Sequence, residues 1–175
     1  MIQDDIQDVQ VRQVNAPEEI GALRAMLREY LTWAFTIDSG SDVAPTFQGL
    51  DEELAELPGI FAPPTGSLIV ALVHGELAGC VALRQVDERT GELKRMYVRP
   101  AFRGRQLGQR LVGALIDQAR AYGYDRVILD SHVTMTAAHR IYEAAGFRFV
   151  DPPDGFPEAL LPVVVFMELD LAQPA

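Results

Sequence analysis

The sequence of 175 residues contains a single cysteine and no apolar run near the ~20 residues that a membrane-spanning helix requires. One cysteine, Cys80, excludes an internal disulfide and a cysteine-based metal cluster. No two histidines have the spacing of a metal-binding pair, so the sequence predicts no metal site. Residues 1–5 lack the basic and apolar regions of a signal peptide, which predicts a cytoplasmic protein without a membrane span.

Positive charge is also scarce, because 15 lysines and arginines stand against 25 aspartates and glutamates, a net charge of −10. A chain this acidic lacks the broad basic face that nucleic acids and anionic membranes require, so we expect neither as a partner. Hydrophobic residues make up 49% and charged residues 23%, which is typical of a folded protein rather than a disordered one. The length fits one domain, and we expect a single domain over residues 1–175.

One segment inverts this charge balance. No acidic residue occurs between Leu93 and Ile116, and the basic residues there are Lys94, Arg95, Arg99, Arg103, Arg105 and Arg110. We interpret this segment as a binding site for a phosphate-bearing ligand, since the local field matters more to a small anion than the total charge. The simpler alternative is a solvated basic loop.

The same segment reads as a strand, a glycine loop and a helix. Residues 93–98 are rich in strand formers, and Pro100 ends the strand because it cannot donate to a ladder. Gly104 and Gly108 mark the loop, and apolar residues then recur at helical spacing at Leu107, Leu111, Val112 and Leu115. This order directs free backbone N–H groups and a helix dipole at one point, where a phosphate group would bind.

The rest of the chain alternates between predicted strands and helices. Strands are expected near Val9 and Val11 and over residues 68–73, 77–86, 126–130, 147–150 and 163–169. Helices are expected over residues 17–34, capped by Asn15, and over residues 50–57 and 136–145, with loops or turns at residues 37–47, 87–91 and 151–162. The order predicts an antiparallel meander before the glycine loop and a parallel strand pair across the central helix. Cys80 falls in a predicted strand, which favours a buried structural thiol over a nucleophile.

Residues 103–108, Arg-Gly-Arg-Gln-Leu-Gly, resemble the pyrophosphate loop of the GNAT superfamily of acetyl-CoA-dependent N-acetyltransferases. That signature is Gln or Arg, two residues, Gly, one residue, then Gly or Ala; Arg103 and Gly108 fit its ends, and Gln106 replaces the middle glycine. Residues 138–147 resemble the family's second signature, Ala-x-x-x-Tyr-x-x-x-Gly-Phe, and the element order matches over nearly the whole chain. The resemblance implies an α/β fold of GNAT type, with a mixed central sheet of about six to seven strands flanked by about four helices.

The resemblance also implies acetyl-CoA as cosubstrate. Its pyrophosphate would bind the loop and the helix N-terminus, and its pantetheine arm would pair with the strand before the loop, where a backbone N–H of residues 96–98 would meet the thioester oxygen. The implied cofactor-binding residues are Met96, Tyr97, Val98, Arg103, Gly104, Arg105, Gln106, Leu107, Gly108, Gln109 and Ser131.

Two residues are implied as catalytic. Tyr142 matches the family's tyrosine near the coenzyme sulfur, which protonates the departing thiolate; the alternative is a core tyrosine on a helix. Glu92 precedes Arg103 by the interval at which some relatives carry a glutamate that deprotonates the amine; the alternative is a glutamate that only begins a strand.

The acceptor in this family binds between the first helix with its following loop and the last hairpin, which here supply Tyr30, Trp33, Phe35, Phe47 and Phe156. Together with Asp38, Asp42 and Asp51 these aromatic residues would suit a cationic primary amine of a small molecule or peptide. Alternatively, Trp33 and Phe35 only anchor the first helix to the core. Dimerisation is common in the family, and no segment of the sequence identifies an interface.

The hypothesis from sequence is therefore an enzyme that transfers acetyl from acetyl-CoA directly to an amine, without a covalent intermediate. One rival is a non-catalytic acyl-CoA sensor of the same fold. A nucleotide-binding domain is disfavoured, because the sequence lacks both the Lys-Ser/Thr of a P-loop and an early strand followed by Gly-x-Gly-x-x-Gly.

Overall fold

The computed structural model describes residues 8–14, 16–37 and 50–172. The predicted cap at Asn15, the predicted loop over residues 38–47 and the proposed acceptor residues Phe47, Asp38 and Asp42 lie outside these residues. Of the helices in the described residues, none combines the length and the apolar character that a membrane crossing requires.

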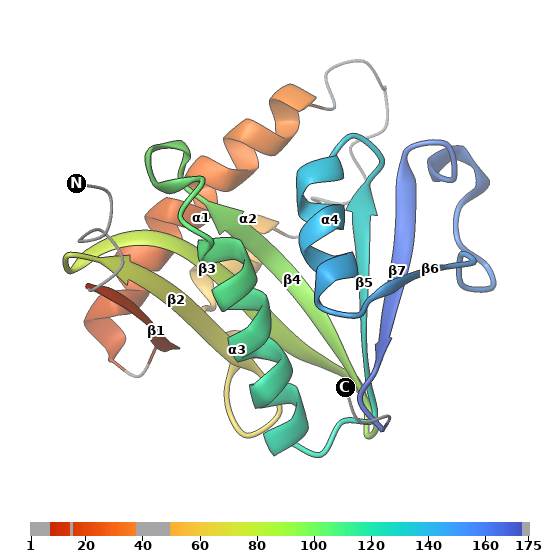
Figure 1. The fold of residues 1–175 in the computed structure, drawn as a ribbon, viewed down its shortest axis with the longest axis horizontal. Coiled ribbons are helices and arrows are strands. Elements are labelled where there is room, and N and C mark those ends of the chain that lie inside the picture. The colour runs from red at the N-terminus through yellow and green to blue at the C-terminus, as the bar shows by residue number, and fades with distance from the viewer. Residues whose placement is uncertain (1–7, 15, 38–49, 173–175) are drawn as a thin grey trace.

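A seven-stranded mixed sheet in the order β1-β2-β3-β4-β5-β7-β6 forms the centre of the fold (Figure 1). Its strands are β1 (Val9–Gln13), β2 (Ser67–Val73), β3 (Glu76–Asp87), β4 (Thr90–Val98), β5 (Arg126–His132), β6 (Arg148–Val150) and β7 (Val164–Asp170). The α-helices are α1 (Pro17–Ile37), α2 (Leu50–Ala55), α3 (Leu107–Ala121) and α4 (Thr136–Ala144), and short 3-10 turns occur at Gly59–Phe61, Pro100–Phe102 and Glu158–Leu160. The α/β fold with six to seven strands and four helices, predicted from sequence, is confirmed.

Both faces of the sheet are covered, which explains the continuous apolar runs of its central strands. Along β2 the side chains alternate, so that Ile69 and Ala71 join the core beneath α3, whereas Leu68 and Val70 join the core beneath α1 and α2. Figure 1 shows α3 across one face of the sheet and α1 with α2 on the other. A strand buried on both faces has no polar side, so the alternation that marks a half-exposed strand is missing.

The parallel pair predicted across the central helix is present, but it is short. β4 and β5 pair only at Thr90 with Arg126, Gly91 with Val127, and Glu92 with Ile128, although both strands continue well beyond these positions. Figure 1 shows the two strands meeting where β4 begins and diverging toward the carboxyl end of β5. Beyond these three residue pairs the sheet is split between β4 and β5, although the two strands are neighbours in the strand order.

The predicted turn over residues 87–91 is wrong in its second half. β3 runs to Asp87 and β4 begins at Thr90, because an Asp87 carboxylate oxygen accepts a hydrogen bond of 2.8 Å from the Arg89 N–H and tightens the turn. Thr90 and Gly91 are buried and pair with β5, so the central strand begins three residues earlier than its apolar pattern indicates.

Candidate active site

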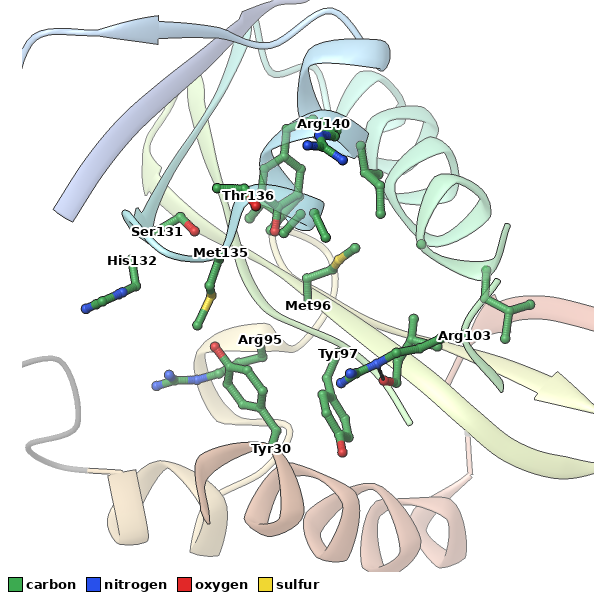
Figure 2. Close-up of a pocket in the computed structure, with 18 of the residues that line it drawn as sticks. Tyr30, Arg95, Met96, Tyr97, Arg103, Ser131, His132, Met135, Thr136 and Arg140 are labelled. Carbon is green, nitrogen blue, oxygen red and sulfur yellow. Dashed lines mark hydrogen bonds between the residues drawn. The ribbon is translucent and has the colours of Figure 1, made fainter. Parts of the chain in front are cut away.

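A cavity of about 720 Å³ occupies the gap between β4 and β5 (Figure 2). Its wall comes from α1, the second half of β4, the loop that leads into α3, the first turn of α3, the end of β5 with the loop after it, and α4. Since these parts are spread along the sequence from Tyr30 to Tyr142, the cavity exists only after the sheet has formed.

The glycine loop forms one end of this cavity, as the sequence predicts. Arg103, Gly104 and residues 106–109 line it, and α3 begins at Leu107 without a side-chain cap. Gln106, which stands where the family's signature has its middle glycine, adopts the left-handed conformation with a φ of 60°, a conformation that glycine adopts without steric cost. The N–H groups of the first turn of α3 have no side-chain cap and remain available to an anion.

Gly108 is the point where three elements meet most closely. A Cβ atom on Gly108 would lie 2.7 Å from Ile141 Cδ1 of α4 and 3.0 Å from Met96 Cε of β4. Both of those side chains line the cavity. The absence of a side chain at Gly108 therefore allows the first turn of α3 to lie close to α4 and β4 at this end of the cavity.

Some basic residues of the segment face the cavity and others do not. Arg103 lines the cavity, donates to the Val98 carbonyl oxygen at 3.1 Å, and lies 5.4 Å from the centre of the Trp33 ring. Arg99 instead pairs with Glu29 of α1 at 2.6 Å. Arg105 is not among the lining residues, and its guanidinium lies 5.9 Å from the Phe102 ring centre. The structure thus does not bring the predicted phosphate contact Arg105 to the cavity, and it adds Arg140 of α4, which lies outside the basic segment.

Tyr142, the predicted proton donor, lies on α4, is 5% exposed and lines the cavity. Its ring packs against Phe147, with 5.9 Å between ring centres. Burial raises the pKa of the Tyr142 hydroxyl above its ordinary value, and the charges of Tyr30 and Asp130 act in the same direction. The hydroxyl therefore keeps its proton throughout the neutral pH range.

Glu92, the predicted base, is not brought to the cavity. It is buried, and its carboxylate accepts a hydrogen bond of 2.5 Å from Arg84 Nε and pairs with Lys94 Nζ at 3.3 Å. Lys94 lines the cavity and donates at 2.8 Å to Asp130, which also lines it. Glu92 therefore reaches the site only through this chain of ion pairs. Sequence reasoning missed Asp130, whose one signal is its place at the end of a predicted strand.

Ser131, a predicted coenzyme contact, lines the cavity next to Asp130. Its hydroxyl oxygen lies 3.0 Å from Nε2 of His139, a buried residue of α4. Desolvation lowers the pKa of His139, so the ring is neutral at neutral pH and fixes the position of Ser131.

Some of the predicted acceptor residues line the cavity and others lie away from it. Tyr30 and Trp33 of α1 line the cavity together with Tyr97, and their ring centres lie 5.6 Å and 6.1 Å from that of Tyr97. Tyr97 was assigned to the donor through its backbone, and its side chain joins Tyr30 and Trp33 in an aromatic wall on the α1 side. Phe156 is not a lining residue and packs edge-on against Phe166 at 4.8 Å, and the side chain of Phe35 lies outside the described residues.

Comparison with known proteins agrees with this geometry. The sequence profile of the acetyltransferase (GNAT) family matches residues 23–147, which span the cavity-forming elements from α1 to α4. The chain belongs to the acetyltransferase (GNAT) family. An uncharacterized N-acetyltransferase of Schizosaccharomyces pombe is 33% identical over 168 residues, which cover 95% of this acetyltransferase and 97% of that protein. The N-acetylaspartate synthetase of Danio rerio is 34% identical over 109 residues, 61% of this chain and 39% of that protein.

Solved members of the family share the fold. The PaiA N-acetyltransferase of Thermoplasma acidophilum, in complex with coenzyme A, aligns with a TM-score of 0.70 over 93% of this chain and 98% of that one, at 16% identity. A GNAT family acetyltransferase of Elizabethkingia anophelis with acetyl-CoA bound aligns with a TM-score of 0.59 over 94% and 99%, at 17% identity. This acetyltransferase therefore has the fold of proteins that were crystallised with coenzyme A or acetyl-CoA bound.

Cys80 of this acetyltransferase is a buried thiol, as predicted, with an exposed fraction of 2%. Burial raises its pKa to about 12, so about one thiol in 10⁵ is ionised at pH 7. We expect iodoacetamide to leave the native enzyme unmodified and active, and to alkylate Cys80 once the chain is unfolded in guanidinium chloride. Intact-mass measurement checks both states, and rapid loss of activity on alkylation of the native enzyme would contradict the assignment.

Proposed function

We propose that this acetyltransferase moves the acetyl group of acetyl-CoA directly to the primary amine of a small molecule, with Tyr142 as general acid. The observation that carries the proposal is that one cavity joins the uncapped N-terminus of α3, the buried Tyr142 hydroxyl and the aromatic wall of Tyr30 and Trp33. Transfer from a phosphate-bearing donor to an amine requires a site for the donor's phosphates, a proton donor for the leaving group and a surface that holds the amine. The N-terminus of α3, Tyr142 and the aromatic wall supply these three parts.

The residues at the donor end fit the pyrophosphate of acetyl-CoA. The first-turn N–H groups of α3 supply donors and a positive helix dipole, and Arg103 and Arg140 add two cations on the cavity wall. Across the cavity, a β-bulge in β4 places both Arg95 and Met96 opposite the one residue Val81, because Lys94 pairs with Ala82 and Tyr97 with Cys80. A bulge interrupts the ladder, which supports the assignment of a β4 backbone N–H to the thioester oxygen.

The reaction balances with the groups in the cavity. The nitrogen lone pair forms a bond to the thioester carbon, the carbon–sulfur bond breaks, and the leaving thiolate takes the proton of the Tyr142 hydroxyl. The nitrogen loses its proton to a water molecule, which passes it to solvent or to Asp130, the acidic side chain among the described lining residues. Tyr142 then regains a proton from solvent, and no bond to the protein forms at any stage.

We propose an indirect role for Glu92, since its carboxylate contacts Arg84 and Lys94 rather than the cavity. It is a positioning residue that holds Lys94 against Asp130. The burial of Glu92 supports this view, because a buried carboxylate without partners would cost several kcal/mol and here both oxygens are paired.

The acceptor proposed is a small molecule rather than a protein side chain. The N-acetylaspartate synthetase of Danio rerio is named for a small acetylated product, and the IAA acetyltransferase of Azospirillum brasilense, 35% identical over 113 residues, is likewise named for a small molecule. The site is a cavity with α1 and α4 in its wall, which favours a small ligand that fits entirely within it.

A thiol-release assay with a panel of small amines tests the proposed function. We expect coenzyme A to be released only when an amine is present, with an equal amount of N-acetylated product by mass spectrometry. Incubation with acetyl-CoA alone should leave the intact mass of the protein unchanged, because transfer is direct. Binding of acetyl-CoA without product from any amine would favour the acyl-CoA sensor, and an acetylated protein intermediate would overturn direct transfer.

A further inference from the structure

Arg95 of β4 has a backbone conformation that arginine rarely adopts. Its φ is 57°, in the left-handed region, and it lies at the bulge where Arg95 and Met96 together face Val81 of β3. A residue other than glycine in this conformation is strained, because its Cβ atom crowds the following carbonyl oxygen, and bulges re-aim the side chains they carry. Such local strain persists where the surrounding structure holds it, and it occurs often at ligand sites.

The Arg95 side chain is directed to the cavity and held there. It lines the cavity, and Glu53 of α2 accepts from its Nε at 2.9 Å and from its Nη2 at 3.1 Å. This pairing uses one edge of the planar guanidinium. The N–H groups of the other edge, on Nη1 and Nη2, have no hydrogen-bond partner within the described residues, and that edge has the spacing of a carboxylate.

Arg95 also lies on the side of the cavity that we assign to the acceptor. Figure 2 shows its side chain beside Tyr30 and below His132, across the cavity from Arg103 at the donor end. Lys94, the other cation of β4 on the wall, is already bonded to Asp130 and Glu92. The acceptor side therefore offers one arginine with a free edge, next to the aromatic wall of α1.

The described part of the cavity wall offers one carboxylate to the acceptor. Among the described lining residues Asp130 is the one acidic side chain, and it is paired with Lys94 at 2.8 Å. Glu53 lies behind Arg95 and is not a lining residue. One carboxylate can meet one amine, but a second ammonium group would find the Arg95 guanidinium in place of an anion.

We propose that the acceptor amine carries a carboxylate, as an amino acid does, and that Arg95 binds this carboxylate through its free edge while the amine faces Asp130 and the thioester. The inference rests on the proposed function and names its substrate class. Arg95 is then a specificity-determining residue, and the bulge with its left-handed backbone is the device that aims it. Glu53 fixes the guanidinium plane, so little side-chain freedom is lost when the substrate binds.

Matched pairs of acceptors test the proposal in the wild-type enzyme. Each L-amino acid of a panel of acidic, neutral and aromatic side chains is compared with its own carboxamide in the thiol-release assay. We expect kcat/KM for the preferred acid to exceed that of its carboxamide by more than about tenfold, since hydrogen bonds to charged groups contribute about 1.5–3 kcal/mol. Amidation makes the neighbouring amine less basic, which raises its unprotonated fraction at neutral pH and so works against the expected preference for the acid.

Variants assign the preference to Arg95. Arg95→Gln should raise KM for the acid by at least tenfold, leave that of the carboxamide nearly unchanged, and retain the thermal shift produced by acetyl-CoA. The control is Arg99→Gln, which also removes an ion pair to a helix, here between the residue that follows β4 and Glu29 of α1, but outside the cavity wall. Glu53→Gln, which keeps Arg95, should preserve the preference for the acid and so separates carboxylate binding from the anchoring of α2.

Three results would overturn the inference. Carboxamides acetylated as well as the acids would remove it and leave the proposed function intact. An Arg95→Gln enzyme that binds acetyl-CoA and still prefers the acid would assign the preference to another residue. Failure of every amine, acid or carboxamide, to release coenzyme A would overturn the inference together with the proposed function.

Discussion

The Tyr142→Phe enzyme should have a kcat at least about 10²-fold below that of the wild type, with the KM for acetyl-CoA nearly unchanged. General acid catalysis by a positioned side chain typically contributes 10²–10⁴-fold, and Tyr142 is a buried tyrosine of α4 that lines the cavity. Phenylalanine keeps the ring and its packing on Phe147 but cannot protonate the thiolate. The measurement is steady-state thiol release at saturating concentrations of both substrates.

The matched control is Tyr124→Phe. Tyr124 is equally buried, and its hydroxyl donates to the Thr65 carbonyl oxygen at 2.7 Å, outside the cavity. Losing that hydrogen bond should cost about 1 kcal/mol of folding free energy and leave kcat unchanged. A Tyr142→Phe enzyme with a kcat within threefold of the wild type, where the Tyr124→Phe enzyme behaves as expected, would show that Tyr142 is only a core tyrosine.

The pH dependence follows from the raised pKa of Tyr142. Burial holds the folded-state pKa above the unfolded value of about 10, so the stabilisation from the protonated hydroxyl is fully present below pH 10 and is lost only as the pH rises through the higher folded value. The kcat profile of the wild type should therefore show no falling limb from Tyr142 between pH 6 and about pH 9. In that range the profile of Tyr142→Phe should have the same shape at a lower level.

The Gly108→Leu enzyme should lose the thermal stabilisation that acetyl-CoA gives to the wild type. A ligand at a hundredfold excess over its Kd stabilises the folded state by about 2.7 kcal/mol, or roughly 5–11 °C in Tm for a chain of this length. A side chain at residue 108 would meet Ile141 and Met96 within 3.0 Å, so leucine must displace both from the cavity wall or move α3 away from it. Differential scanning fluorimetry with and without acetyl-CoA measures the loss.

Gly113→Leu is the control for this substitution. Gly113 lies in the same helix, and a Cβ atom there would meet nothing within 4 Å. Leucine is a better helix former than glycine by about 0.5–1 kcal/mol, so this enzyme should be at least as stable as the wild type and keep the full shift. A folded Gly108→Leu enzyme, shown by its circular dichroism, that retains the shift would place the donor elsewhere.

The order of elements was predictable because it depends on short-range patterns. The strand before Pro100, the turn at Gly104 and the helix after Leu107 follow from local propensity, and the family's signature identified the loop at Arg103 and Gly108. Tyr142 was found in the same way, through its spacing from Gly146 and Phe147. Within the described residues, each of these positions takes the element that the sequence assigns to it, and Arg103, Gly108 and Tyr142 all line the cavity.

Side-chain direction was less predictable, because it depends on partners distant in sequence. Arg99 and Arg105 belong to the same basic segment as Arg103, but Arg99 turns to Glu29 of α1, and Arg105 stacks on Phe102. Glu92 stands at the interval expected of a base, but β4 and β5 are still paired there, so its carboxylate points to Arg84 and Lys94 instead of the gap.

The sequence by itself determined the class of fold, through the order of its elements, and it supplied the candidate donor loop and the candidate proton donor, through signatures a few residues long. The tertiary structure alone decided where the cavity lies, since the cavity exists only because β4 and β5 stop pairing after Glu92 and Ile128. It also decided which charges face the acceptor. The left-handed Arg95 results from a register shift against β3, and the approach of α2 brings Glu53 to its guanidinium; neither leaves a local pattern in the sequence.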